Sequence, residues 1–119
     1  MKCYLLANVM VHDQVEFAEY ISKVPDMIVK YGGRYIVRAG HFELLEGELG
    51  IQRVVMVEFP SREAAAAFYY GVDYAPLLAL RKRTTISQVG FLDSLGKDYV
   101  LGPDGDLNSA VRRYPAVKN

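Results

Sequence analysis

Hydrophobic residues follow two different periods in the first part of the chain. Residues 3–11 are rich in β-branched and aromatic side chains and are apolar on both faces, which predicts a strand covered on both sides. Asp13 then suits a helix N-cap, and Glu16 lies three residues on, as in a capping box. We expect this helix to end at Tyr31, before two glycines, with a break or kink at Pro25. Its apolar stripe consists of Phe17, Ile21, Val24 and Ile28.

Two strands follow this helix. Residues 34–38 predict a second strand, and simple alternation places Tyr35 and Val37 on one face and Arg38 on the other. Residues 52–59 predict a third strand. The connection between the two strands is short and contains glycines, which favours an antiparallel hairpin.

A helical region and a final strand complete the pattern. Ser61 is the natural N-cap of a second helix, which begins with an alanine-rich run. We expect Gly71 to interrupt this helix and Asp73 to cap a continuation that runs to about Arg83. Residues 84–92, rich in Thr, Ile, Val and Phe, predict the fourth strand.

The order strand, helix, strand, strand, helix, strand predicts an α+β fold of the ferredoxin-like βαββαβ type. Right-handed crossovers place both helices on one face of a four-stranded antiparallel sheet. The strands are apolar on both sides, so the other face needs cover from outside the chain. We therefore expect a homodimer with twofold symmetry, a dimeric α/β barrel.

The chain divides into a domain at residues 1–95 and a C-terminal extension at residues 96–119. The extension has a different composition and contains a cluster of turn-forming residues at 102–106. Two interpretations remain open for it. It packs on the domain or on a partner subunit, or it is a partly disordered tail.

Composition and charge narrow the classes of protein. The 119 residues suit one domain, and 14 basic residues balance 14 acidic ones, which argues against nucleic acid or an anionic membrane as partner. No apolar run approaches the ~18 residues of a membrane span. The N-terminus has the pattern of a strand rather than a signal peptide. The single cysteine, Cys3, excludes an intramolecular disulfide and fits a reducing compartment. We expect a cytoplasmic protein.

Polar side chains on otherwise apolar strands are the first candidates for chemistry, because burying them unpaired is costly. They are Asn8, Arg38 and Glu58. If their faces coincide, an amide, a guanidinium and a carboxylate converge in one cavity that would bind a small carboxylate or enolate, or move a proton. The alternative is a structural salt bridge at a strand end.

Histidine and tyrosine supply further candidates. His41 follows just beyond Arg38, where it would serve proton transfer at the rim of the cavity together with Glu58, or would be an ordinary exposed loop residue. Tyr20, Tyr69 and Tyr74 suit a ligand pocket, with core and interface packing as the alternative. Arg53 and Arg81 are interpreted as ion-pair formers. The two histidines are separated and no Cys/His cluster exists, so neither a metal nor a cofactor is expected.

Several segments also carry a family resemblance. The matching residues are Tyr20 with Val24-Pro25, the run Tyr31–Tyr35, Val37–Gly40, Leu45–Gly47, Arg53–Val55, Glu58–Ser61, Ala64-Ala65, Tyr74 and Leu80-Arg81. Over about residues 2–95 the chain resembles the bacterial domain-of-unknown-function family 1330, in the dimeric α/β-barrel superfamily. The resemblance implies a fold and a dimer but no particular activity. Relatives in the superfamily include cofactor-free monooxygenases, small-lactone isomerases, haem-dependent enzymes and ligand-binding or stress-response domains.

Three functions are compatible with these observations. The favoured one is a dimeric domain that binds a small organic molecule without turnover. The second is a cofactor-free enzyme, an isomerase or a monooxygenase-like protein that moves a proton on a small acidic or carbonyl compound. In it Arg38 would orient the substrate while Glu58 or His41 moves the proton. The third is a structural or stress-related oligomer. The sequence names no substrate.

Overall fold

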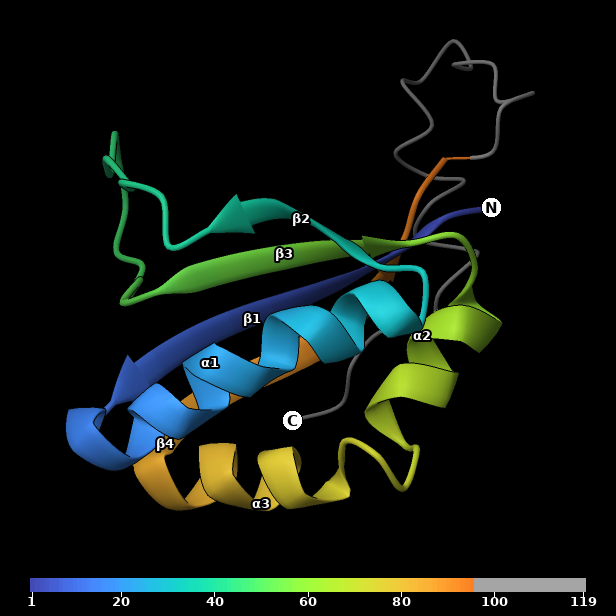
Figure 1. Cartoon of the computed structure of the whole chain (residues 1–119). Helices are drawn as coiled ribbons and strands as arrows, with labels where there is room; N and C mark the ends of the chain where they lie inside the picture. The colour runs from blue at the N-terminus through green and yellow to red at the C-terminus, as the bar shows by residue number, and fades with distance from the viewer. Residues whose placement is uncertain (96–119) are drawn as a thin grey trace, which may run out of the picture.

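The computed structural model describes residues 1–95, and the predicted C-terminal extension lies outside these residues. The described part contains four strands and three helices (Figure 1). In chain order they are β1 (Cys3–Val11), α1 (Gln14–Lys30), β2 (Arg34–Arg38), β3 (Val54–Phe59), α2 (Arg62–Tyr69), α3 (Ala75–Thr84) and β4 (Thr85–Asp93). Within residues 1–95, no helix is long and apolar enough to span a bilayer.

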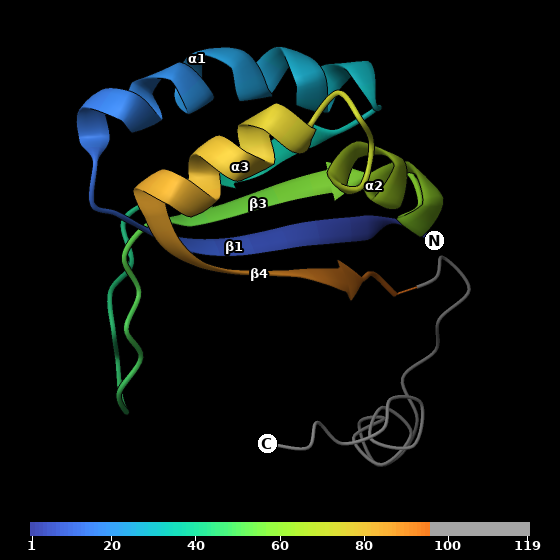
Figure 2. The same cartoon turned by 90° about the horizontal axis from the view of Figure 1, so that it is seen from below.

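The four strands form one antiparallel sheet in the order β2-β3-β1-β4. The two crossovers, α1 in the first and α2 with α3 in the second, lie on the same face of this sheet (Figure 2). This arrangement confirms the predicted ferredoxin-like α+β fold. The connection between β2 and β3 extends away from the helical side (Figure 2).

Helix α1 begins and ends as predicted, with Asp13 as its N-cap and Tyr31 as its C-cap. The Asp13 carboxylate accepts a hydrogen bond from the Glu16 backbone N–H at 3.0 Å. The Glu16 side chain bonds to Arg83. The predicted break at Pro25 is wrong, because the helix continues through this residue to Lys30. Proline removes a single backbone donor, and the burial of Val24 and Ile28 on either side holds the helix together.

The second crossover differs from its prediction at Asp73. Ser61 caps α2 as expected, with its hydroxyl accepting from the Ala64 backbone N–H at 3.0 Å. The predicted cap at Asp73 is wrong, because α3 begins after Tyr74 with no side-chain cap. The Asp73 carboxylate instead accepts hydrogen bonds from Lys30 at 2.7 Å and from the Tyr31 hydroxyl at 2.8 Å. Asp73 therefore fastens the turn before α3 to the end of α1.

Two adjacent glycines after α1 meet different requirements. Gly32 has a φ of 83°, a conformation that side chains disfavour. Gly33 lies against the core, where an added Cβ would stand 2.7 Å from Ile28 Cγ2 and 2.8 Å from Phe59 Cε1. Gly32 therefore allows the turn that leaves α1. Gly33 allows the chain to enter β2 in close contact with Ile28 and Phe59.

A β-bulge at Ile36 changes which face the end of β2 presents. Tyr35 pairs with Val57, but the next pairs are Val37 with Met56 and Arg38 with Val55. One extra residue on β2 therefore lies between these pairs, and the alternation shifts by one position. The predicted faces are wrong for this reason. Arg38 lies on the helical side of the sheet together with Tyr35, and Val37 lies on the outer side.

The core fills the space between the helices and the sheet. It contains alternate residues of β1 and β3 together with the inner residues of the helices, and the side chains of Phe59 and Val57 are almost completely buried. The opposite face of the sheet stays exposed in the single chain. Its exposed apolar residues are Leu6, Met10, Ile36, Ile86 and Leu92.

Candidate functional site

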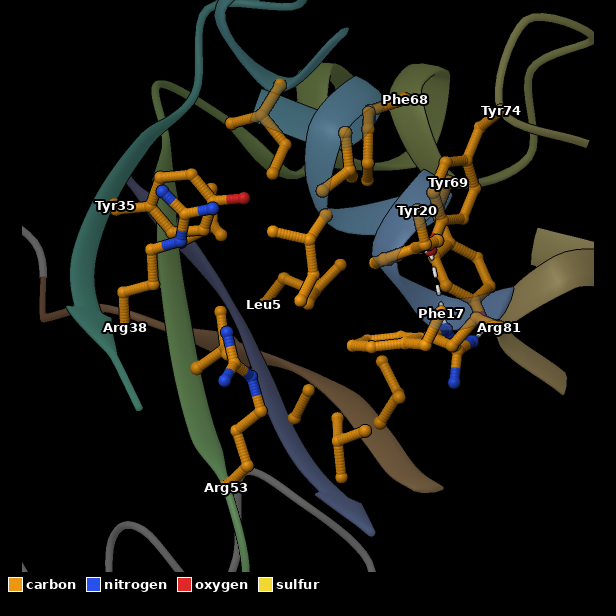
Figure 3. Close-up of a pocket in the computed structure, with 18 residues that line it drawn as sticks. Leu5, Phe17, Tyr20, Tyr35, Arg38, Arg53, Phe68, Tyr69, Tyr74 and Arg81 are labelled. Atoms are coloured by element: carbon orange, nitrogen blue, oxygen red, sulfur yellow. Dashed lines mark hydrogen bonds between the residues drawn. The ribbon is translucent and has the colours of Figure 1, made fainter. Parts of the chain in front are cut away.

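A pocket lies between the helical layer and the inner face of the sheet (Figure 3). The space between its lining atoms, with the open mouth included, is ≈ 640 Å³. Its walls are mainly aliphatic and aromatic, which suits the apolar body of an organic molecule. The apolar lining residues are Leu5, Ala7, Val9, Phe17, Ile21, Val24, Ile28, Val55, Val57, Phe68 and Val89.

All the charged side chains that line this pocket within residues 1–95 are positive. The polar lining consists of three arginines and four tyrosines: Arg38, Arg53, Arg81, Tyr20, Tyr35, Tyr69 and Tyr74. Among residues 1–95, no aspartate, glutamate or histidine lines it. Three fixed positive charges therefore face an apolar space with no negative charge from the described lining to balance them.

One end of the pocket is formed by β2 and the start of β3. The Arg38 guanidinium lies over the Tyr35 ring, 4.8 Å from its centroid, and Arg53 points toward the same region (Figure 3). Burial raises the pKa of the Tyr35 phenol, while the charges of Arg38 and Arg53 oppose that rise. Neither arginine forms an ion pair within residues 1–95. We call these three residues the arginine end.

The other end is a cluster of tyrosines around Arg81 on α3 (Figure 3). The hydroxyl oxygens of Tyr20 and Tyr74 are 2.6 Å apart. Arg81 Nε donates to the Tyr74 hydroxyl at 3.4 Å, and Arg81 Nη2 donates to the Tyr69 hydroxyl at 3.1 Å. We call these four residues the tyrosine end. It brings together side chains from α1, α2, α3 and the turn that precedes α3.

Aromatic packing fixes the tyrosine end. Phe17 stacks on Tyr20 with ring centroids 5.1 Å apart, and Phe68 lies 4.5 Å from Tyr74. Burial, followed by the proximity of Tyr74, raises the pKa of Tyr20 far above its ordinary value. Burial works to lower the pKa of Arg81, but its hydrogen bond to Tyr74 and the surrounding hydroxyls raise it overall. At neutral pH Tyr20 therefore keeps its proton and Arg81 keeps its positive charge.

The structure does not bring Arg38, Glu58 and Asn8 together, so the expected convergence is wrong. Glu58 lies on the outer face, where its carboxylate bonds to Arg34 at 3.0 Å and to Lys2 at 3.1 Å. These two partners lower the pKa of Glu58, Arg34 first. The Asn8 side chain donates to the Gly50 carbonyl at 2.8 Å and accepts from the Gln52 backbone N–H at 3.0 Å. The bulge in β2 accounts for the separation of Arg38.

The remaining predicted residues divide between the pocket and the surface. Tyr20, Tyr69 and Tyr74 line the pocket with Arg38. His41 is exposed in the connection after β2 and does not line the pocket. Within residues 1–95, no group of three or more His, Cys, Asp or Glu side chains is arranged to hold a metal ion.

Sequence reasoning missed Arg53, Arg81 and Tyr35. Arg53 precedes Val55, Val57 and Phe59 at a spacing of two, so the period of the strand already places it on the inner face. Arg81 follows Tyr74 and Leu77 at helical spacing on a buried stripe, and only 6% of its surface is exposed. Both interpretations as ion-pair formers are wrong for the described part of the chain, because neither arginine contacts a carboxylate there.

Comparison with known proteins decides the family. A family model described as "Domain of unknown function (DUF1330)" matches residues 2–95. The chain belongs to the DUF1330 family. This membership confirms the resemblance noted from the sequence, and it covers all the described elements of the DUF1330 domain. No curated protein matches the chain in sequence.

Solved structures share the fold of the DUF1330 domain. The RPA0582 protein of unknown function from Rhodopseudomonas palustris superposes with a TM-score of 0.66 at 20% identity, over 80% of this chain and 83% of that chain. Its methylated form gives 0.65 at 19%, over 82% and 84%. SnoaB, a cofactor-independent oxygenase from Streptomyces nogalater, gives 0.56 at 12%, over 82% of this chain and 96% of that chain. Similarity at these identities extends to the fold alone.

Proposed function

We propose that this DUF1330 domain binds a small organic anion, with the apolar body of the molecule between sheet and helices and its acidic group at the arginine end. The observation that carries this proposal is the pocket lining itself. Three guanidinium groups and four phenols face an apolar space, and residues 1–95 contribute no acid to it. Arg38 is exposed and Arg53 is half-buried, whereas Arg81 is buried. The charge of Arg81 attracts an anion more strongly than it would in water, because its surroundings screen charge poorly.

Arg38 and Arg53 are suited to a carboxylate in particular. A guanidinium presents its N–H donors in a planar fork that matches the two oxygens of a carboxylate. Both side chains are free of ion pairs within the described residues, so a ligand does not have to displace an internal partner. Tyr35 supplies an additional phenol next to them.

We also propose that the domain acts as a cytoplasmic homodimer through the outer face of its sheet. The exposed residues Leu6, Met10, Ile86 and Leu92 form an apolar surface on neighbouring strands β1 and β4. Burying such a surface against a second copy is favourable by about 25 cal/mol per Å². A twofold dimer presents the same surface from both subunits, which suits this single apolar face. Light scattering at micromolar concentration should give the mass of two chains, and a monomer there would contradict this proposal.

Catalysis by a cofactor-free route is the second candidate, supported by the shared fold with a cofactor-independent oxygenase. Arg38 would then hold the substrate. Glu58 and His41 lie away from the pocket, so this candidate does not rest on them. Oxygen consumption or isomerisation of a bound ligand is the measurement that favours catalysis. Binding without turnover favours the first candidate, and no binding with a stable oligomer favours a structural role.

The binding proposal is tested with a charged ligand and its neutral isostere. Phenylacetate should bind to the full chain more tightly than phenylacetamide in calorimetric titrations. Arg38→Gln and Arg53→Gln should each weaken phenylacetate binding about tenfold, because each removes charge-assisted hydrogen bonds. Arg34→Gln is the matched control, since Arg34 lies on the same strand but bonds to Glu58 on the outer face.

Equal binding of the acid and the amide, or equal losses in the Arg34 and Arg38 variants, would refute the pocket assignment. Native mass spectrometry of the protein purified from its own host is a second test, which detects co-purified compounds without a choice of ligand in advance. A co-purified acidic compound that is lost from the Arg38→Gln variant supports the proposal, while a retained one places the ligand elsewhere.

A further inference from the structure

The tyrosine end lies across the pocket from the arginine end (Figure 3). We propose that Tyr20, Tyr74 and Arg81 form a second recognition point, which binds the ionised oxygen of a phenol or enol on the same ligand. The ligand class is then a carboxylic acid that carries an aromatic hydroxyl or an enol at its far end. This inference rests on the proposed binding function, because it places one molecule across the same pocket.

Hydrogen-bond donors exceed acceptors at the tyrosine end. The hydroxyls of Tyr20 and Tyr74 share one hydrogen bond, so within residues 1–95 one of their two hydrogens has no acceptor, whichever group donates. The Tyr69 hydroxyl accepts from Arg81 and retains its own hydrogen. The Arg81 guanidinium has five N–H donors, and within residues 1–95 it donates two side-chain hydrogen bonds, one to Tyr74 and one to Tyr69. An acceptor oxygen in the pocket satisfies several of these donors together.

The charge of Arg81 supports an anionic rather than a neutral acceptor. Only 6% of this residue is exposed, and no carboxylate forms an ion pair with it in the described part of the chain. A buried guanidinium without a counterion is costly. Phenol oxygens offset part of this cost, and an oxyanion supplied by the ligand offsets more. A negative oxygen is therefore the species that this site favours most.

The ionisable groups that face this position come from three elements and one turn. They are Tyr20 on α1, Tyr69 at the end of α2, Tyr74 in the turn before α3, and Arg81 on α3, with Tyr35 across the pocket. Within residues 1–95, no aspartate, glutamate or histidine lines the pocket to take up a proton. The pocket therefore favours ionisation by stabilising the anion, and the proton leaves to bulk water. An opposite charge within about 4–6 Å lowers the pKa of an acid by about 1–3 units.

The probe for this inference is 4-hydroxy-3-nitrophenylacetate, which has a carboxylate at one end and a phenol at the other. Its phenol absorbs at longer wavelength when ionised, so a spectrophotometric pH titration gives its pKa in the free and the bound state. We expect the bound phenol to ionise at least about one pH unit lower than the free phenol. That shift means that the phenolate binds about tenfold more tightly than the phenol.

Variants separate the two ends of the pocket. Arg81→Met keeps much of the side-chain volume but removes the charge, and should abolish most of the shift while probe binding persists through the arginine end. Tyr20→Phe is a milder change in the same cluster and should reduce the shift. Lys82→Met is the control, because Lys82 is the exposed neighbour of Arg81 on α3. It should leave the shift unchanged.

The outcomes distinguish this inference from the proposed function. A probe that binds in an Arg38-dependent manner but keeps its free pKa overturns the inference and leaves the binding function standing. An unchanged shift in both Arg81→Met and Tyr20→Phe also overturns it. A probe that fails to bind at millimolar concentration, together with phenylacetate, overturns both. Tighter binding of the probe than of 3-nitrophenylacetate, which lacks the hydroxyl, supports the inference independently of the spectrum.

Discussion

Gly33→Ala tests whether the close packing between the end of α1 and the sheet is essential. The backbone of Gly33 is not in the left-handed region, so alanine meets no conformational penalty there. Its Cβ, however, would stand 2.7 Å from Ile28 Cγ2 and 2.8 Å from Phe59 Cε1. Since carbon atoms pack at ~3.5 Å or more, the two contacts are about 0.8 and 0.7 Å too short. Either the helix end or the Phe59 ring must move.

The two energetic consequences oppose each other. Overpacking of this kind costs about 1–3 kcal/mol. Loss of the glycine's freedom in the unfolded chain returns about 0.4–1 kcal/mol. We therefore expect Gly33→Ala to lower the free energy of unfolding by about 1–2 kcal/mol. Gly50→Ala is the matched control, because nothing lies within 4 Å of its Cβ position and its φ is not positive. It should be neutral or slightly stabilising.

Urea unfolding followed by far-ultraviolet circular dichroism measures both variants, and the absence of tryptophan makes this a better probe than indole fluorescence. A slope of about 2 kcal/mol per M, in the middle of the usual range, converts the expected loss into a midpoint about 0.5–1 M lower. All samples need one protein concentration, because dimer formation would contribute to stability. A Gly33→Ala midpoint at or above that of the wild type would refute the argument, since the core would then accommodate the methyl group without cost.

Two further predictions concern the outer face, and one concerns α1. Asn8→Ala removes both hydrogen bonds to the connection before β3, so it should cost about 1 kcal/mol and speed amide exchange at Gln52; unchanged exchange would contradict this role. The depressed pKa of Glu58 contributes stability that is present above its unfolded value of about 4.3 and is lost as the pH falls through its folded value. The stability deficit of Glu58→Gln should therefore shrink as the pH is lowered from 6 toward about 3, and a constant deficit would show that the ion pairs are unimportant. Asp13→Ala should cost about 1 kcal/mol through loss of the α1 cap, whereas Asp13→Ser should retain most of the stability in thermal melts.

The fold was predictable because its elements depend on local patterns. The period of two in residues 3–11, the period of 3.6 after Asp13 and the caps at Asp13 and Ser61 are all visible in the sequence. Where local preference and tertiary contact competed, tertiary contact prevailed. Asp73 has a good capping side chain, but its carboxylate does not cap α3. It accepts hydrogen bonds from Lys30 and Tyr31 instead, which lie 43 and 42 residues away in sequence.

The candidate site was less predictable because it depends on register. Alternation identifies faces only while strand pairing stays regular, and the extra residue at position 36 has no distinctive sequence signature. Arg38 was therefore grouped with Glu58 and Asn8 instead of with Tyr35. Arg81 was missed for a different reason. A buried arginine without a carboxylate goes against the usual preference of arginine for ion pairs, so only its place on a buried helical stripe indicated its position.

The bulge at Ile36 also bears on how relatives of different length should be aligned. Without that residue, Tyr35, Val37 and Arg38 would follow one another in regular alternation and would keep the faces they have now. A relative that lacks a residue equivalent to Ile36 is therefore expected to retain its arginine in the pocket. An alignment with that relative should place the gap at position 36. An ungapped alignment would match Arg38 with the wrong residue. For such a relative, the position of a single gap in β2 determines which residue is compared with Arg38.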